Sequence, residues 1–244
     1  MRIMLLVYFL SFPFIIIGQD IGPLVSDRPD QSDGACVLPK KIFQVESGCV
    51  FQKSDYQHTT MLRYGLTHST EVRLQFDQSM LDKRYTVLPT ILSVKQRLIK
   101  QDGIIPTITF IGYGIYDRIT VEDKKQNKYE GMALLAFQND FSDLSGIEYN
   151  IGTNSAGTDL ILTLLYAYRV HPKLNLFIEY FSEFANDAIP KHNIDGGALY
   201  QINDDFQVDV GIGIHVASII ETPFIKVGAS YRFLSPSKIK PFFE

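Results

Sequence analysis

Tryptophan is absent from the 244 residues, cysteine occurs only twice, and after the first 18 residues no apolar run is long enough to cross a membrane as a helix. Basic residues are not in excess either: 23 Lys and Arg stand against 27 Asp and Glu, for a formal net charge of −4. A nucleic-acid partner is therefore not expected, because such proteins neutralise phosphates with a basic surface. The hydrophobic content of 45% is sufficient for one sizeable folded domain.

Residues 1–18 have the composition of a secretory signal peptide. Arg2 forms a short basic region, residues 3–17 are mainly apolar, and Gly18 is a small residue at the expected cleavage point. The alternative is a membrane anchor, but the apolar segment is shorter than the roughly 20 residues of a helical span and contains Pro13. We therefore expect a secreted mature chain.

Long alternating segments dominate the mature chain. Between residues 206 and 216 apolar side chains alternate with polar residues or glycine, and the pattern returns between residues 225 and 233. A period of two predicts strands. Strands of about ten residues with one apolar face are typical of transmembrane β-barrels, whereas strands of soluble proteins usually have about five or six residues. A secreted chain built this way is expected in the outer membrane of a Gram-negative bacterium, since only helices and closed barrels satisfy their backbone groups in lipid.

The pattern predicts an all-β fold, a twelve-stranded antiparallel transmembrane β-barrel over residues 41–233. Tight turns near residues 69, 102, 143, 171 and 203 alternate with longer connections near 55, 82, 123, 155, 188 and 219. This alternation matches short periplasmic turns and longer outer loops, with both termini in the periplasm. The charged segment 116–130 is predicted as the longest interruption between strands, and residues 68–71 as a tight turn between short strands at 62–67 and 72–77.

The polar faces of these strands are predicted to line the lumen with nearly balanced charges. One hypothesis is that opposed basic and acidic side chains create a transverse field along which a small solute passes. The alternative is that the charges pair into salt bridges that fill and brace the interior. The predicted lumen residues are Glu46, Arg63, Arg73, Lys95, Arg97, Asp140, Glu148, Asp159, Arg169, Glu179, Asp195, Asp209, Lys226 and Arg232.

Residues 19–40 form an N-terminal arm rich in proline, glycine and aspartate, which indicates a loop and not a strand. The arm carries a charged cluster containing Asp27, Arg28 and Asp30. We hypothesise that the arm folds into the periplasmic mouth as a plug or gate, with these three residues paired to lumen charges. The alternative is a solvated periplasmic tail, because chain termini are often mobile.

Catalytic motifs are missing. The sequence contains neither Gly-x-Ser-x-Gly nor His-Glu-x-x-His, and Cys36 and Cys49 lack the spacing of metal ligands. No metal or other cofactor is expected, and an enzyme is not predicted. A Ser/His/acid set can be written from His215, Ser218 and Glu221, but loop spacing does not establish its geometry. Whether Cys36 and Cys49 form a disulfide or remain free thiols is left open by the sequence.

Several sequence blocks together resemble a known family. They are Ser26–Gln31, Pro39–Gly48, Leu62–Thr67, Glu71–Leu74, Lys95 with Arg97, Phe177–Tyr180, Asp195–Gly197 and Tyr231–Phe233. In their order they are similar to the family of proposed outer-membrane transporters labelled "meta-pathway of phenol degradation". The chain departs from the family pattern in its C-terminal extension, residues 234–244, so the barrel-assembly machinery could read its signal from Phe233 or from Phe242–Phe243.

The resemblance implies a barrel surrounded by outer-membrane lipids that passes small, often hydrophobic or aromatic compounds. Passive transport of such a solute is therefore the predicted function. Two alternatives stay open: a non-conducting structural or surface-interaction barrel that uses residues 116–130 for contacts, and an outer-membrane lipid hydrolase.

Overall fold

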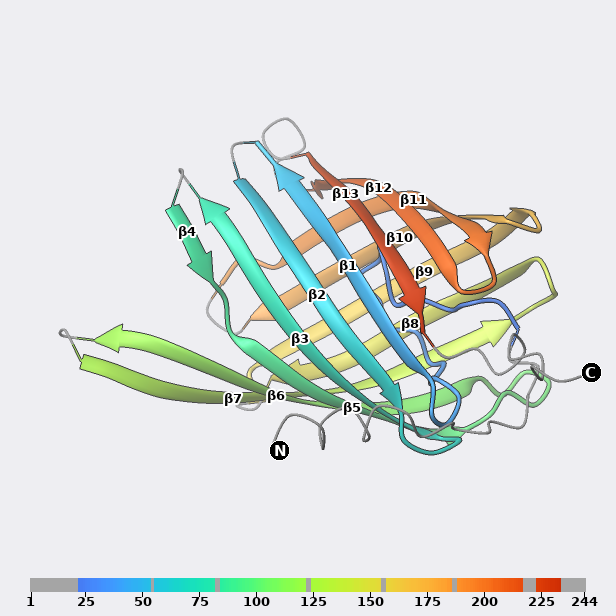
Figure 1. Cartoon of the computed structure of the whole chain (residues 1–244), viewed down its shortest axis with the longest axis horizontal. Helices are drawn as coiled ribbons and strands as arrows, with labels where there is room; N and C mark the ends of the chain where they lie inside the picture. The colour runs from blue at the N-terminus through green and yellow to red at the C-terminus, as the bar shows by residue number, and fades with distance from the viewer. Residues whose placement is uncertain are drawn as a thin grey trace, which may run out of the picture.

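The computed structural model describes residues 22–53, 55–81, 84–121, 124–154, 157–185, 188–216 and 223–233, which form an antiparallel β-barrel (Figure 1). The predicted signal peptide, the C-terminal extension and two residues of the hypothetical catalytic set, Ser218 and Glu221, lie outside the described residues. No helix among the described residues is both long and apolar enough to cross a membrane. The strands are β1 (Phe43–Gln52), β2 (Asp55–Gly65), β3 (Thr70–Leu81), β4 (Arg84–Val87), β5 (Thr90–Ile99), β6 (Thr107–Val121), β7 (Lys124–Asp140), β8 (Ser145–Asn154), β9 (Asp159–His171), β10 (Leu174–Ala185), β11 (Lys191–Asn203), β12 (Phe206–His215) and β13 (Phe224–Arg232).

The strands close into a ring because β1 pairs with both β2 and β13, and β2 pairs with β3. The short β4 and the longer β5 both pair with β3, so they occupy one position in the wall, and the barrel is twelve-stranded as predicted. Their shared strand is interrupted at Leu88 and Pro89. Proline has no N–H to donate to a ladder, and the N–H of Leu88 donates to the Asp77 carbonyl at 2.9 Å.

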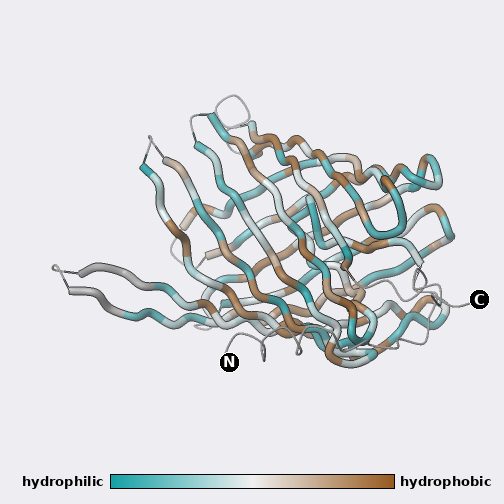
Figure 2. The backbone as a smooth tube through the Cα atoms, viewed as in Figure 1, coloured by the Kyte–Doolittle hydropathy of each residue, from teal (hydrophilic) through white to brown (hydrophobic). Residues whose placement is uncertain are grey.

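The wall is apolar outside and polar inside. Large apolar residues of every second position, such as Leu92, Leu164, Ile178 and Ile212, are exposed on the outer surface, while charged residues of the intervening positions are buried in the lumen. Figure 2 shows this alternation as brown and teal along the barrel strands. An apolar outer surface is favourable in contact with lipid tails, so the arrangement agrees with an outer-membrane location.

We call the end of the barrel that carries the tight turns, such as the one between β11 and β12 at Asp204 and Asp205, the turn end. Aromatic rings gather where β1, β12 and β13 reach this end. Phe43 and Phe233 have ring centroids 5.5 Å apart, and Tyr231 packs edge-on against Phe233 at 4.8 Å. Since Trp is absent, Tyr and Phe alone supply the rings at this rim.

Two sequence predictions are wrong in detail. Residues 116–130 do not form a loop: β6 and β7 continue through this segment as a hairpin that projects beyond the barrel (Figure 1). A strand outside lipid needs no apolar face, and Tyr116 and Tyr129 pair in register there with ring centroids 5.4 Å apart. The turn predicted at 68–71 is also too long, because β3 begins at Thr70 and runs to Leu81.

The N-terminal arm lies inside the barrel, where Figure 1 shows it in blue between the near and far walls. The N–H of Leu24 donates to the Asp204 carbonyl at 2.8 Å at the turn end of the barrel. The chain then passes along the lumen and returns to the same end. There the backbone N–H of Lys41 donates to the Gly65 carbonyl at 2.7 Å. The arm is therefore a loop with both ends at the turn end of the barrel.

Candidate lumen site

Asp27 of the arm lies against three cations on neighbouring strands. Its carboxylate is 3.0 Å from Arg73 on β3, 3.0 Å from Lys95 on β5 and 3.4 Å from Arg63 on β2. Burial by itself would raise the pKa of Asp27, but the charges of Arg63, Lys95 and Arg73 outweigh it and lower that pKa below its usual value. Asp27 is therefore ionised while the arm is docked. We call Arg63, Arg73 and Lys95 the basic triad.

Arg63 also has partners in the wall itself. It contacts Glu46 of β1 at 2.5 Å and Glu71 of β3 at 2.6 Å, and all three side chains are buried. The same Glu71 accepts a 2.7 Å hydrogen bond from the N–H of Leu38 in the arm. Arg63 is thus balanced by wall carboxylates as well as by Asp27.

The far wall of the ring is acidic. Glu179 on β10 accepts hydrogen bonds from the N–H groups of Gln31 at 2.8 Å and Ser32 at 2.6 Å, while Asp195 on β11 pairs with Lys226 at 2.5 Å. In the ring order, β10 lies on the opposite side from β3. The arm therefore crosses between a basic wall and an acidic wall, presenting a carboxylate to the first and backbone N–H groups to the second.

Arg28 docks in a notch made by two glycines. Its guanidinium lies 3.3 Å from Asp209 on β12 and donates to the Val227 carbonyl at 3.2 Å. A Cβ on Gly48 would lie 2.0 Å from the guanidinium, and a Cβ on Gly228 would lie 2.4 Å from it. Only glycine leaves room for this side chain at the two positions.

The returning part of the arm packs on the β6 and β7 side. Asp33 pairs with Arg73 and accepts a hydrogen bond from the Tyr113 hydroxyl, and its N–H donates to Asn150 at 2.8 Å. Ala35 lies in a buried apolar cluster with Ile111 of β6 and with Leu134 and Ala136 of β7. Both polar and apolar contacts therefore hold this part of the arm in the lumen.

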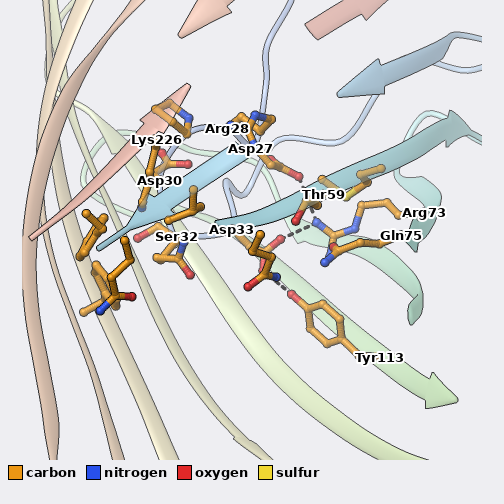
Figure 3. Close-up of a pocket in the computed structure, with 18 of the residues that line it drawn as sticks. Asp27, Arg28, Asp30, Ser32, Asp33, Thr59, Arg73, Gln75, Tyr113 and Lys226 are labelled. Atoms are coloured by element: carbon orange, nitrogen blue, oxygen red, sulfur yellow. Dashed lines mark hydrogen bonds and ion pairs between the residues drawn. The ribbon is translucent and has the colours of Figure 1, made fainter. Parts of the chain in front are cut away.

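Two cavities remain on the outer side of the arm. One of about 360 Å³ is bordered by arm residues 27–33 and by Tyr113, Phe181 and Phe224, and Figure 3 shows part of its lining. The other, of about 390 Å³, shares Gln31, Asp33 and Phe181 with it. Both cavities therefore border the arm.

Asp30 borders the first cavity, and no ion pair involving its side chain occurs among the described residues. Its Oδ1 atom is buried without a hydrogen-bond partner. Burial raises the pKa of Asp30 well above its usual value, and the nearby carboxylates of Glu179, Glu148 and Asp27 raise it further. Docking of the arm therefore favours the protonated form of Asp30.

The predicted lumen residues separate into two groups. The structure brings a central group together in buried contacts with the arm or with one another: Glu46, Arg63, Arg73, Lys95, Glu179, Asp195, Asp209 and Lys226. Glu148 borders the arm at Gly34, and Arg232 pairs with Asp205 at 2.8 Å near the turn end of the barrel. The remaining four lie toward the ends of the barrel: Arg97 donates to the His68 carbonyl, Asp159 accepts from Asn154, and Asp140 and Arg169 are exposed.

Three site residues were missed by the sequence analysis. Glu71 was assigned to a turn, although it begins the polar face of β3, and Asp33 and Tyr113 were not selected at all. The alternation along β6 places Tyr113 on the same face as Thr109 and Ile111, so strand parity could have identified it. Asp33 has no such signal, because it lies in an irregular segment.

Of the hypothetical catalytic set, only His215 lies among the described residues. Its ring nitrogens contact Asn193 and Gln52, which are amides and not carboxylates. Among the described residues, no group of three or more His, Cys, Asp and Glu side chains is placed to hold a metal ion. Cys36 and Cys49 are both free thiols; Cys36 contacts Gln138 at 3.4 Å in the lumen, whereas Cys49 is on the other face of β1 from Glu46 and Gly48.

Comparisons with known proteins agree with this architecture. The sequence family described as "Putative MetA-pathway of phenol degradation" matches residues 26–233. The crystal structure of an outer membrane channel from Pseudomonas putida F1 is similar with a TM-score of 0.63 and 12% identity, covering 84% of this chain and 100% of that one. NanC porin (TM-score 0.59, 7% identity, 78% and 98% coverage) and KdgM porin (0.58, 8%, 78% and 99%) share the fold. A search of curated protein sequences finds no match.

Proposed function

The chain belongs to the family described as "Putative MetA-pathway of phenol degradation", and from this premise we propose that it is an outer-membrane channel for passive passage of a small solute. The observation that carries the proposal is the lumen: a charged interior that is hollow on its outer side and filled by a tethered arm at its centre. Porin-like barrels of the same fold support a channel.

The solute we propose is small, with a hydrophobic or aromatic part. Tyr113, Phe181 and Phe224 border the 360 Å³ cavity, beside polar groups such as Gln57 and Thr59. Ligand sites commonly combine apolar and aromatic walls with a few polar groups that orient the ligand. A cavity of about 360 Å³ is large enough for one compound of this kind.

We propose that the arm is the gate, with Asp27 and Arg28 as its ionic anchors and Asp30 at its tip. The arm crosses the centre of the lumen, and its ion pairs reach β2, β3, β5 and β12. Passage then requires that the arm move. The predicted lumen charges would line the path once it has moved.

Single-channel conductance of the refolded mature chain tests the proposal. We expect small or rare steps from the full mature chain and larger or more frequent steps after deletion of residues 19–35. Asp143→Asn, an exposed change in a periplasmic turn, is the matched control and should behave like the unmodified chain. Silence from both forms, with folding verified by heat-modifiable gel mobility, would contradict a channel.

A non-conducting structural barrel is the second candidate, because the arm is held by many well-formed contacts and the β6–β7 hairpin projects as a surface for other molecules. Silent but folded barrels in the same experiment would favour it. In either case we propose that the barrel-assembly machinery inserts the chain, with Phe233 beside Phe43 as the last aromatic residue of the barrel.

A further inference from the structure

Two cations of the basic triad, Arg73 and Lys95, take their ion-pair partners from the arm. Among the described residues, the ion pairs of Arg73 involve Asp27 and Asp33, and the ion pair of Lys95 involves Asp27. Both carboxylates belong to the arm. Arg63, by contrast, keeps two wall carboxylates whether or not the arm is present.

Arg73 and Lys95 both depend on a negatively charged partner. Lys95 is 0% exposed and Arg73 is 2% exposed. These exposures belong to the docked state, in which Asp27 contacts both cations; without the arm, Arg73 and Lys95 lose these charge-assisted bonds. When the arm leaves the lumen, the site therefore favours another anion in its place.

The site is also shaped for a carboxylate. Arg73 is held from two sides: its Nε donates to Ser93 at 2.9 Å, and its guanidinium lies over the Tyr113 ring at 5.4 Å from the centroid. Lys95 reaches both oxygens of Asp27, at 3.1 and 3.0 Å. The donors converge on one carboxylate from adjacent strands, and Figure 3 shows Arg73 directed at the arm aspartates. Charge-assisted hydrogen bonds of this kind are stronger than hydrogen bonds between neutral groups.

We infer that the basic triad is a binding site for the carboxylate of the transported solute, and that Asp27 occupies it as a tethered competitor, an inference that rests on the proposed channel function. The cavity of about 360 Å³ borders this site, since Asp27, Arg73 and Tyr113 are part of its lining. The carboxylate binds the triad and the rest of the solute occupies the cavity. Solute and arm are therefore mutually exclusive, and the solute itself favours opening.

The experiment measures binding and conductance separately. The probes are 4-fluorobenzoate, 4-fluorobenzylammonium and 4-fluorobenzyl alcohol, which share a ring and differ in charge. Their binding to the full mature chain in detergent is followed by ¹⁹F NMR, for the unmodified chain and for Asp27→Asn. We expect Asp27→Asn to bind 4-fluorobenzoate at least tenfold more tightly than the unmodified chain and to show no such gain for the other two probes.

Two further variants make the test specific. Asp30→Asn removes an arm carboxylate that has no ion pair to the triad, so it should produce no gain in 4-fluorobenzoate binding. Lys95→Gln in the Asp27→Asn background should abolish the gain. If Asp27→Asn fails to refold, Asp33→Asn frees Arg73 from its other arm partner and should shift 4-fluorobenzoate binding in the same direction.

The outcomes separate this inference from the channel proposal. Equal binding of 4-fluorobenzoate to the unmodified chain and to Asp27→Asn, or an equal gain for the ammonium probe, would overturn the carboxylate site even if the chain conducts. Absence of conductance would overturn the channel proposal, while the NMR result would still decide whether the triad binds carboxylates.

Discussion

Gly48 of β1 and Gly228 of β13 are register partners, and the guanidinium of Arg28 occupies the space that their side chains would take. The two glycines thus form part of the arm's binding surface. All three atoms nearest to a Cβ at Gly228 belong to Arg28, at 2.4 to 2.7 Å, whereas a Cβ at Gly48 would also meet the Val227 carbonyl at 2.6 Å. Gly228 is therefore the position of the two where a methyl group would meet the arm first.

Gly228→Ala is expected to weaken arm docking by about 1–3 kcal/mol, the usual cost of inserting a methyl group into a packed site. Channel opening should increase by about 5- to 150-fold, since about 1.4 kcal/mol is a factor of ten. Conductance measures the change. Gly211→Ala on β12 is the control, because its Cβ would meet nothing closer than 3.5 Å. In the chain without residues 19–35, Gly228→Ala should have no effect, and an effect there would contradict the explanation.

Cys36 offers a chemical report of the docked arm. Burial raises the pKa of its thiol from 9.0 to about 11, and only the thiolate reacts with alkylating reagents. At pH 8 the thiolate fraction is therefore about 100-fold lower than for a thiol of pKa 9.0. In a Cys49→Ser background, we expect slow alkylation of Cys36 by iodoacetamide, and at least tenfold faster alkylation when Lys95→Met removes an anchor of Asp27. Equal rates in both chains would show that the arm does not protect the thiol.

Arm docking should weaken as the pH rises above the usual aspartate range. Docking raises the pKa of Asp30 through burial and through Glu179, Glu148 and Asp27, with Lys226 as the opposing charge. Between the ordinary value of 3.8 and the raised value, the docked arm holds a proton that the released arm does not, so docking loses free energy as the pH increases through this window.

Conductance measured at increasing pH above 3.8 tests this expectation, and Asp30→Asn should flatten the pH dependence. Asp27 acts in the opposite direction: its pKa is lowered by docking, so its contribution is lost only as the pH falls below about 3.8. A steeper pH dependence in Asp30→Asn than in the unmodified chain would contradict the assignment to Asp30.

Arg63→Leu is expected to destabilise the barrel itself. The change leaves Glu46 and Glu71 buried without the cation that lies 2.5 and 2.6 Å away, and breaking a buried pair in this way typically costs about 3–5 kcal/mol. Urea unfolding in lipid measures the loss. Arg97→Gln, which removes one hydrogen bond to the His68 carbonyl in a turn, should cost only about 1 kcal/mol. Equal losses for the two variants would refute the central role of Arg63.

The alternation of side chains was sufficient to predict the barrel, because lipid and lumen impose opposite chemistry on successive residues of each strand. The same parity placed Arg63, Arg73, Lys95, Glu179, Asp195, Asp209 and Lys226 on the lumen face. The β6–β7 hairpin escaped prediction for the complementary reason: beyond the membrane, strand pairing persists without an apolar face, so the charged segment 116–130 carried no strand signal.

The sequence by itself thus determined a twelve-stranded outer-membrane barrel with a charged interior, since these properties depend on a local period of two along each strand. Only the tertiary structure decided which charges meet. Asp27 pairs with Lys95, and Arg28 pairs with Asp209. The two residues of each pair are far apart in the sequence, so a local pattern cannot predict the contact. The irregular arm has no period that would predict its path, and its position follows from the closed ring, which brings a basic and an acidic wall to face one another around it.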